Sequence, residues 1–449
     1  MPASYSLVPS PDGDALLLVA MGDAWGLPAH PCSSAGDVNR RIREAFGIDV
    51  TVATSFGEVL DGHSHVYLLA HQNHGTGGEL PRSARWVERK ELETLLFVDP
   101  EQRKLAEEWF AMGAGHDQAA LSPAAWAGED WFAEASAWMT EAAARASLSV
   151  TGPVEQFMCS PYSVTMRIPT SAGFAYFKAA PPEFAYEPVL VSAVAEWFPQ
   201  HTPRVLEIDQ DRAWLLTLGL EPFHQIEPTL QHVELYERMV RVYARMQRET
   251  AGKVETLLAM GVPDRRPDTL PSLLEELLQD EVSLLYAGDG ALTRDEHARL
   301  LDFVPVFREQ CARLAGFHLP DTLQNVDFWR DNIAVTTDGF VFLDWAESVI
   351  SSPIHSMNMV LRDFVIHDVR DKEELHRRLF EAYFSEWADH EPMERLQEAY
   401  QLSQSGSVLC RALSWRDSTA SLGEPRRHAY LRPAVAANTR RLLEFADIS

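Results

Sequence analysis

The chain has 449 residues, 46% hydrophobic and 23% charged, which is enough for two or three globular domains. Its formal net charge of −27 excludes nucleic acid and membrane surfaces as expected partners, because both carry negative charge and would repel it. The charge is compatible with a cationic small molecule. The simpler interpretation is an acidic surface that keeps the protein soluble.

Cysteine usage and the lengths of the apolar runs indicate a cytoplasmic protein. The four cysteines, Cys32, Cys159, Cys311 and Cys410, are widely scattered and form no CxxC pair. We therefore expect reduced thiols, not disulfides or a zinc site. The apolar run at 15–21 is too short for a signal peptide core or a membrane span, and no longer run follows it.

Short strands and helices alternate along the first 112 residues. Periodicity and flanking turn residues predict strands at 15–20, 50–55, 65–70 and 85–87. Helices are predicted at 34–46, with Ser34 as the N-cap, and at 101–112. The next segment, 113–128, is rich in Ala, Gly and polar residues and is interpreted as a linker, followed by a helix at 131–146.

The stretch from Gly26 to Ile48 contains part of a spaced motif. The pattern is G-x5-E-x7-R-E-U-x-E-E-x-G-U, where U is a bulky apolar residue. The residues in register with it are Gly26, Arg40, Ile42, Glu44, Gly47 and Ile48. This stretch resembles the Nudix motif, and the segments at 85–87 and 91–92 resemble the closing strand and helix of that fold.

Most of the metal-binding acids of the Nudix motif are missing. Cys32, Arg41 and Ala45 occupy three acidic positions, so only Glu44 remains. Because a diphosphate site needs several carboxylates to bind magnesium, we expect a Nudix-like α/β domain at 1–113 that has lost hydrolysis. Two alternatives stay open: a working hydrolase, which the missing acids argue against, and a turn and helix that match the motif by chance.

Beyond the linker, strands dominate as far as about residue 220, with one helix at 188–197, and helices dominate from 227 onward. The exception is a strand-loop-hairpin segment at 323–344. Its two apolar strands are joined by a turn that ends in Asp338-Gly339. Asn332 directly precedes the first strand and Asp344 directly follows the second, so both lie at the same end of the hairpin.

This arrangement suits phosphoryl transfer. Asp327, on the loop before Asn332, can orient an attacking hydroxyl and accept its proton, while Asn332 and Asp344 supply oxygen ligands for magnesium. Upstream, Lys178 ends an apolar strand and Glu187 begins a helix nine residues later. A Lys–Glu ion pair of this kind positions nucleotide phosphates.

Together these features resemble the aminoglycoside phosphotransferase and choline kinase superfamily over residues 148–449. The matched segments include Trp214–Thr217 as the strand into the hinge and Asp344-Trp-Ala-Glu347, followed by Ser351-Ser-Pro353. The resemblance implies an α+β, bilobal protein-kinase-like fold, with a small β-rich lobe at 148–222 and a helical lobe at 223–449. The segment 114–147 is then the linker and helix between the Nudix-like domain and this fold.

The resemblance also implies Mg²⁺ and ATP or GTP, with a nucleotide and a small-molecule acceptor as the partners. Nucleotide contacts are expected from Lys178, Glu187, Thr217 and the loop with Ser160 and Ser163. Candidate substrate residues, chosen by their position near Asp327, are Trp329, Arg330 and Glu347.

Two positions depart from the family pattern: Asn325 replaces a usual histidine, and Asp331 replaces a usual glycine. Asn325 puts full activity in doubt, because that histidine mainly holds the site architecture. The leading hypothesis is a kinase acting on a hydroxyl group of a metabolite or antibiotic. The alternative is a non-catalytic nucleotide-binding or scaffold protein with degenerate kinase and Nudix sites.

Overall fold

The computed structural model describes residues 4–32, 34–59, 64–71, 80–111, 125–128, 130–160, 162–286, 290–366, 370–420 and 432–446. These residues form two compact units. Unit 1 comprises the described residues up to 182 together with 214–217, and unit 2 comprises the remainder. Of the predicted linker at 113–128, residues 113–124 lie outside the described residues. No helix within the described ranges is both long and apolar enough to cross a membrane.

The N-terminal part of unit 1 contains two small sheets, with strand orders β4-β1-β6-β5 and β3-β2-β7. Its strands are β1 (Ser4–Leu7), β2 (Ala15–Met21), β3 (Ala24–Gly26), β4 (Ala29–His30), β5 (Val50–Val59), β6 (Ser64–His71) and β7 (Ala84–Glu88). Its α-helices are α1 (Ala35–Phe46) and α2 (Pro100–Ala111). The predicted strands and helices are confirmed. Ser34 caps α1 by accepting a hydrogen bond from the Asp37 amide at 3.2 Å.

A third sheet with strands in unit 1 contains β12 (Trp214–Leu218), β10 (Gly173–Ala179), β9 (Ser163–Thr170) and β8 (Glu155–Ser160), in that order. Helix α4 (Trp131–Arg145) packs on it through a cluster of aromatic side chains. Trp131 and Trp138 contact Phe177 and Trp214 edge-on, with ring centroids 5.5–5.9 Å apart. This packing anchors β10, which carries Lys178.

The side chain of Gln156 on β8 links this third sheet to the N-terminal part of unit 1. Its amide accepts a hydrogen bond from the Val52 backbone N–H and donates one to the Val52 carbonyl, both at 2.8 Å. It also accepts one from the Asn39 side chain at 2.9 Å. Gly36 permits this close approach, because a Cβ there would lie 2.5 Å from the Gln156 carbonyl oxygen. One buried amide therefore joins β5, β8 and α1.

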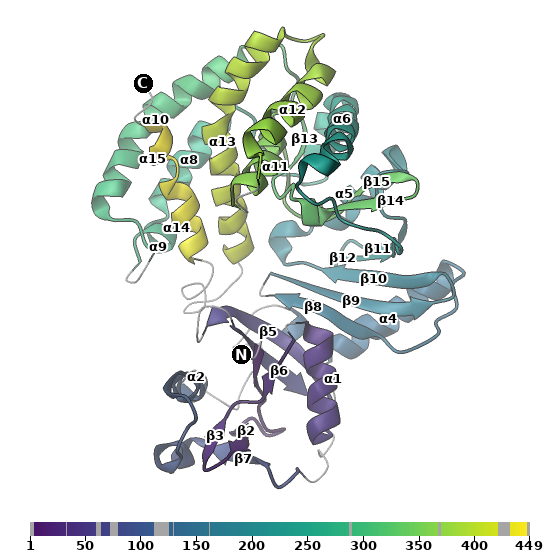
Figure 1. Cartoon of the computed structure of the whole chain (residues 1–449), viewed down its shortest axis with the longest axis vertical. Helices are drawn as coiled ribbons and strands as arrows, with labels where there is room; N and C mark the ends of the chain where they lie inside the picture. The colour runs from purple at the N-terminus through teal and green to yellow at the C-terminus, as the bar shows by residue number, and fades with distance from the viewer. Residues whose placement is uncertain are drawn as a thin grey trace. The chain divides into compact units, whose positions relative to one another are not determined.

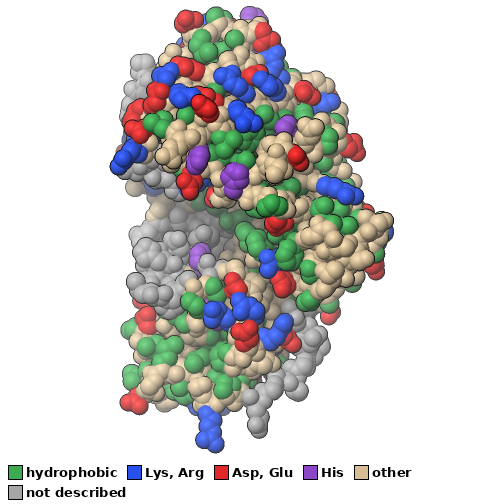
Figure 2. Space-filling view, turned by 45° about the vertical axis from the view of Figure 1, so that its right-hand side comes forward, with side chains coloured by type: hydrophobic (Ala, Val, Ile, Leu, Met, Phe, Trp, Pro, Cys, Tyr) green, Lys and Arg blue, Asp and Glu red, His purple; other side chains and the backbone are tan. Residues whose placement is uncertain are grey.

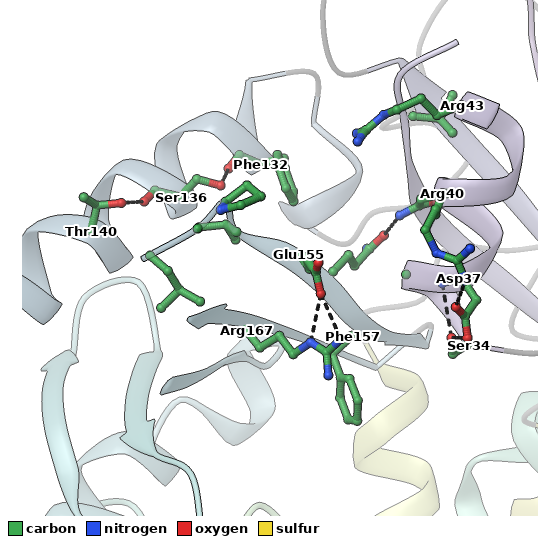
Figure 3. Close-up of a pocket in the computed structure, with 18 of the residues that line it drawn as sticks. Ser34, Asp37, Arg40, Arg43, Phe132, Ser136, Thr140, Glu155, Phe157 and Arg167 are labelled. Atoms are coloured by element: carbon green, nitrogen blue, oxygen red, sulfur yellow. Dashed lines mark hydrogen bonds and ion pairs between the residues drawn. The ribbon is translucent and has the colours of Figure 1, made fainter. Parts of the chain in front are cut away.

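A groove of about 990 Å³ lies beside this junction, lined by α1, α4, β8 and neighbouring residues (Figure 3). Several of its charged groups are paired with one another: Arg167 donates to Glu155 at 2.8 Å, and Arg40 pairs with Asp37. None of the residues predicted to bind nucleotide, metal or substrate lines this groove.

Unit 2 is mainly helical. The long helix α13 packs against α10, α11 and α14 (Figure 1). The helices are α5 (Glu187–Trp197), α6 (Val233–Thr250), α7 (Val254–Ala259), α8 (Leu270–Gln279), α9 (Glu281–Leu284), α10 (Arg294–Ala315), α11 (His355–Ile366), α12 (Lys372–Phe384), α13 (Met393–Ala420), α14 (Arg432–Arg440) and α15 (Leu443–Ala446). The strands are β11 (Val205–Asp209), β13 (Thr322–Asn325), β14 (Ile333–Thr336), β15 (Gly339–Phe342) and β16 (Ser348–Ser351). The α+β composition, the helix predicted at 188–197 and the predicted hairpin are confirmed.

Acidic and basic side chains are interspersed on the face shown in Figure 2. Exposed arginines pair with carboxylates, as in Arg245–Glu386, Arg377–Glu374 and Arg308–Glu275. Such exposed pairs contribute only about 0–1 kcal/mol each to stability. On this face the charge pattern therefore fits a solubilising surface.

Candidate active site

The loop between β13 and β14 holds Asp327 through several hydrogen bonds. The carboxylate Oδ1 accepts from the Trp329 indole N–H at 2.5 Å, and Oδ2 accepts from the Asn332 amide at 3.2 Å. The same Asn332 amide donates to the Asp327 carbonyl at 2.9 Å. Trp329 was a candidate substrate residue, and the structure places it as a donor that orients the Asp327 carboxylate.

Asn325 connects this loop to Asp344. Its side-chain oxygen accepts from the Asp327 backbone N–H, and its side-chain nitrogen donates to the Asp344 carbonyl, both at 2.8 Å. The amide orientation is unambiguous, because a backbone N–H can only donate and a carbonyl can only accept. Asn325 is 1% exposed. The residue expected to weaken the site therefore forms the link between its two key aspartates.

The hairpin brings Asn332 and Asp344 to one end of a pair of strands. Ile333 lies opposite Phe342 in the antiparallel register, and the Leu343 N–H donates to the Asn332 carbonyl at 2.8 Å. Asp344 follows with a φ of 54°, in the left-handed region that non-glycine residues seldom adopt. A strained conformation at this position is typical of a functional site.

Aromatic side chains from α6 and β15 pack against the loop that carries Asp327. Phe328 stacks on Tyr243 of α6 with ring centroids 3.9 Å apart, and Phe342 packs edge-on against Tyr243 at 5.3 Å. The Tyr243 hydroxyl also accepts a hydrogen bond from the Asn325 backbone N–H at 3.0 Å. Phe328 thus anchors the loop to α6 through its contact with Tyr243.

Arg411 of α13 lies between two carboxylates of the site. Its guanidinium is 3.0 Å from Asp327 Oδ1 and also pairs with Glu347 Oε2. Burial, with the Glu347 and Asp344 carboxylates, raises the pKa of Asp327 to about 7, although Arg411 and the Trp329 hydrogen bond act in the opposite direction. Sequence reasoning missed Arg411, because it lies 84 residues beyond Asp327 on a helix with no local motif.

The two other candidate substrate residues differ in their surroundings. Glu347 pairs with Arg411, and its negative charge also raises the pKa of Asp327. Arg330 lies 3.8 Å from the exposed carboxylate of its neighbour, Asp331.

The start of α5 lies beside the segment that follows Asp344. The Tyr186 hydroxyl donates to the carbonyls of Ala346 and Ser348, the latter at 3.0 Å. Glu187, the next residue, is the first of α5 and is 3% exposed. In a kinase-like site a glutamate of this helix pairs with the lysine of a neighbouring strand. Lys178 belongs to unit 1 and Glu187 to unit 2, so their pairing stays a prediction.

The remaining predicted nucleotide residues lie in unit 1. Ser160 closes the β8–β9 turn: its hydroxyl accepts from the Ser163 N–H at 2.9 Å. Thr217 donates to the Tyr176 carbonyl at 3.5 Å, from β12 to β10. Both contacts hold strands together, and nucleotide binding by these residues stays a prediction.

Several solved phosphotransferase structures are similar to this chain. A choline/ethanolamine kinase family protein from Mesorhizobium loti is 16% identical, with 69% of this chain and 95% of that chain covered and a TM-score of 0.46. Choline kinase from Streptococcus pneumoniae is 12% identical (70% and 100% covered, TM-score 0.46), and a type I macrolide 2'-phosphotransferase is 14% identical (68% and 96%, TM-score 0.43). No family model and no curated protein matches the sequence. Since these TM-scores are below 0.5, the function has to be inferred from the site itself.

The residues of the Nudix-like motif lie on and around α1. Glu44 is exposed and 3.5 Å from Arg40, four residues before it on the same helix. Across all described residues, no group of three or more His, Cys, Asp or Glu side chains is placed to hold a metal ion. A magnesium site near Asn332 and Asp344 would therefore depend on ligands from phosphates and water.

Proposed function

We propose that the protein is a small-molecule kinase that transfers the γ-phosphate of ATP or GTP to a hydroxyl group, with Asp327 as the catalytic base. The observation that carries the proposal is the hydrogen-bonded network of Asn325, Asp327, Asn332 and the Asp344 backbone. It fixes one partly buried carboxylate beside two oxygen-bearing side chains, the combination that phosphoryl transfer requires.

In this mechanism Asp327 orients the acceptor hydroxyl and takes its proton. The hydroxyl oxygen forms a bond to the γ-phosphorus as the bond from phosphorus to the leaving diphosphate oxygen breaks. The hydrogen bonds from Trp329 and Asn332 keep the Asp327 carboxylate in one orientation. A catalytic group that is already oriented lowers the entropic cost of reaching the transition state.

Asn332 and Asp344 would hold the magnesium ion. The Asn332 amide nitrogen donates to Asp327, so the amide oxygen is the atom suited to a cation. Two protein oxygen donors fit Mg²⁺, which usually takes one or two protein ligands and completes its shell with phosphates and water. The bound ion would neutralise charge on the nucleotide phosphates.

We further propose that Lys178, Glu187, Thr217 and the Ser160–Ser163 turn bind the nucleotide, and that 1–113 is a Nudix-like domain without hydrolytic activity. The four cysteines are free, which fits the proposed cytoplasmic setting. The alternative, a non-catalytic nucleotide-binding scaffold, is favoured by Ala45 in the Nudix-like motif and by Asn325. Its two hydrogen bonds to the aspartate segments favour the enzyme.

The test is turnover in a panel of hydroxyl compounds with Mg-ATP and Mg-GTP, followed by release of nucleoside diphosphate. Asp327→Asn should lower kcat by about 10²–10⁴-fold and leave Mg-nucleotide affinity unchanged, since the carboxylate serves proton transfer. Asp331→Asn is the matched control, because its side chain is on the same loop and 72% exposed. Wild-type turnover by Asp327→Asn would refute the assignment. Nucleotide binding without turnover on any acceptor would favour the scaffold.

A further inference from the structure

A pocket of about 380 Å³ lies in the helical unit next to Asp327. It is lined by side chains from α11, α12 and α13 and from residues 441–445. Its volume is within the usual range for small-molecule sites. Three arginines line it: Arg362 from α11, Arg411 from α13 and Arg441 from the turn after α14. We call it the arginine pocket.

Arg411 pairs with Asp327 and Glu347, whereas Arg362 and Arg441 are less well compensated than the arginines on the surface. Among the described side chains Arg362 has no ion-pair partner, and burial together with Arg441 and Arg411 lowers its pKa to about 10. Nη1 of Arg441 is buried and has no hydrogen-bond partner within the described part of the chain. The carboxylate seen near Arg441, that of Glu444, is 4.0 Å away and 64% exposed.

Three converging guanidinium groups are unexpected in a chain with a net charge of −27. Burying like charges together raises the free energy of the empty pocket, and an anion placed among them would relieve it. Guanidinium groups match phosphate and carboxylate geometry through paired hydrogen bonds.

The arginine pocket and the candidate active site share Arg411, which lines the pocket and lies 3.0 Å from Asp327 Oδ1. The rest of the lining suits a small polar molecule. His376 and Tyr400 form a hydrogen-bonded pair at 3.4 Å, and Met359, Val408 and Phe445 add apolar surface. A ligand bound here would therefore lie against Arg411, the side chain that pairs with Asp327.

We propose that the phosphoryl acceptor is an anionic hydroxyl compound, with its phosphate or carboxylate group held by Arg362 and Arg441 and its hydroxyl directed toward Asp327. This inference rests on the proposed kinase function. It replaces the expectation of a cationic acceptor, which three arginines would repel. The net charge of the whole chain thus misrepresents the charge of this site.

Binding of four probes to the full chain tests the proposal at constant ionic strength: glucose 6-phosphate, gluconate, glucose and choline. Calorimetry should detect glucose 6-phosphate or gluconate, and the stronger of the two identifies the anionic group. Arg362→Gln and Arg441→Gln should each weaken that binding by about 10-fold or more, the effect of losing one charged hydrogen-bond donor. Arg377→Gln is the matched control, because Arg377 lies on α12 and is 54% exposed.

Several results would overturn the proposal. These are binding of neither anion, tighter binding of choline or glucose, and anion binding that the two pocket variants leave unchanged. Competition between Mg-ATP and the bound anion would assign the arginines to the nucleotide instead. Circular dichroism and the melting temperature of each free variant exclude misfolding as the cause.

The two proposals can fail separately. Transfer of phosphate to a neutral or cationic acceptor would contradict the anionic acceptor and leave the kinase function intact. Anion binding that depends on Arg362 and Arg441, without turnover in any condition, would support the pocket and contradict the kinase function. Asp327→Asn should keep anion binding, because it does not touch either arginine.

Discussion

The catalytic loop and the arginine pocket lie side by side and present opposite charge. The loop side brings together Asp327, Asp344 and Glu347, while the pocket contributes Arg362 and Arg441, and Arg411 lies between them. The acids lie beside the proposed metal ligands, and the carboxylate seen near Arg441, that of Glu444, is 4.0 Å away and 64% exposed. Under the proposed function, the metal with its nucleotide and the acceptor would therefore be held by groups of opposite charge.

We expect the strongest loss of function at Asp344, the carboxylate proposed to bind magnesium. Asp344→Ala should abolish magnesium-dependent nucleotide binding, with affinity falling by about 10²-fold or more, because it removes the carboxylate expected on the ion. Calorimetry with Mg-ATP measures this directly. Asp338→Ala, an exposed acid in the turn of the same hairpin, is the control. Unchanged Mg-ATP affinity in Asp344→Ala would show that this aspartate does not hold the metal.

Lys178 is proposed to bind the phosphates of the nucleotide, and its substitution tests that role. Lys178→Ala should leave the protein folded and raise KM for ATP by about 10-fold, since the ammonium group would neutralise and position phosphate charge. Steady-state kinetics and the melting temperature give both numbers. Lys90→Ala removes a lysine that is 78% exposed and should change neither. A KM unchanged by the Lys178 substitution would mean that this lysine does not bind the nucleotide.

Asn325 tests whether the loop depends on its link to Asp344. Asn325→Leu removes the partner of the Asp327 N–H and of the Asp344 carbonyl, so it should destabilise the protein by about 1–3 kcal/mol and lower kcat. Asn325→His restores one donor and one acceptor and should lose less of both. Equal losses of stability and of kcat in the two variants would indicate that side-chain packing, and not these hydrogen bonds, maintains the loop.

Gln156 lies outside the catalytic loop and the arginine pocket, so its substitution should change the stability of the protein and not its activity. Gln156→Leu leaves the Val52 N–H and carbonyl without their partner, which should cost about 1–3 kcal/mol. The midpoint of thermal unfolding should fall, with kcat per folded molecule unchanged. Gln210→Leu, at an exposed position, is the control. No change in the midpoint would mean that water replaces the amide.

The smallest expected effect is at Glu44. The full chain should not hydrolyse nucleoside diphosphate derivatives, so Glu44→Gln should change nothing in a phosphate-release assay. Release of phosphate or monophosphate that disappears in this variant would show a working Nudix site.

The catalytic loop could be predicted from sequence because its parts are local. Asp327, Asn332 and Asp344 lie within 18 residues, and the turn at Asp338-Gly339 fixes the hairpin between them. The arginine pocket could not be predicted, because Arg362 and Arg411 come from separate helices and Arg441 from the turn after α14, and no short motif encodes how these segments pack. The very short strands β1, β3 and β4 were missed for a similar reason, since two to four residues show no periodicity.

The structure gives Asn325 a role in the loop that the family pattern does not predict. Departure from the usual histidine predicted a weaker site, yet an amide offers one donor and one acceptor, which is what the Asp344 carbonyl and the Asp327 N–H require. A family pattern records one solution to a hydrogen-bonding requirement, and a different side chain can meet the same requirement.

The amide of Asn325 also has no proton to gain or lose near neutrality. A histidine there would titrate at about pH 6.5 and, once charged, would become a donor at both nitrogens, opposing the Asp327 N–H. The asparagine keeps its hydrogen bonds to both aspartate segments on either side of that pH. The connection between the catalytic loop and Asp344 is therefore insensitive to acidification, and a loss of activity at low pH would have to arise at other groups.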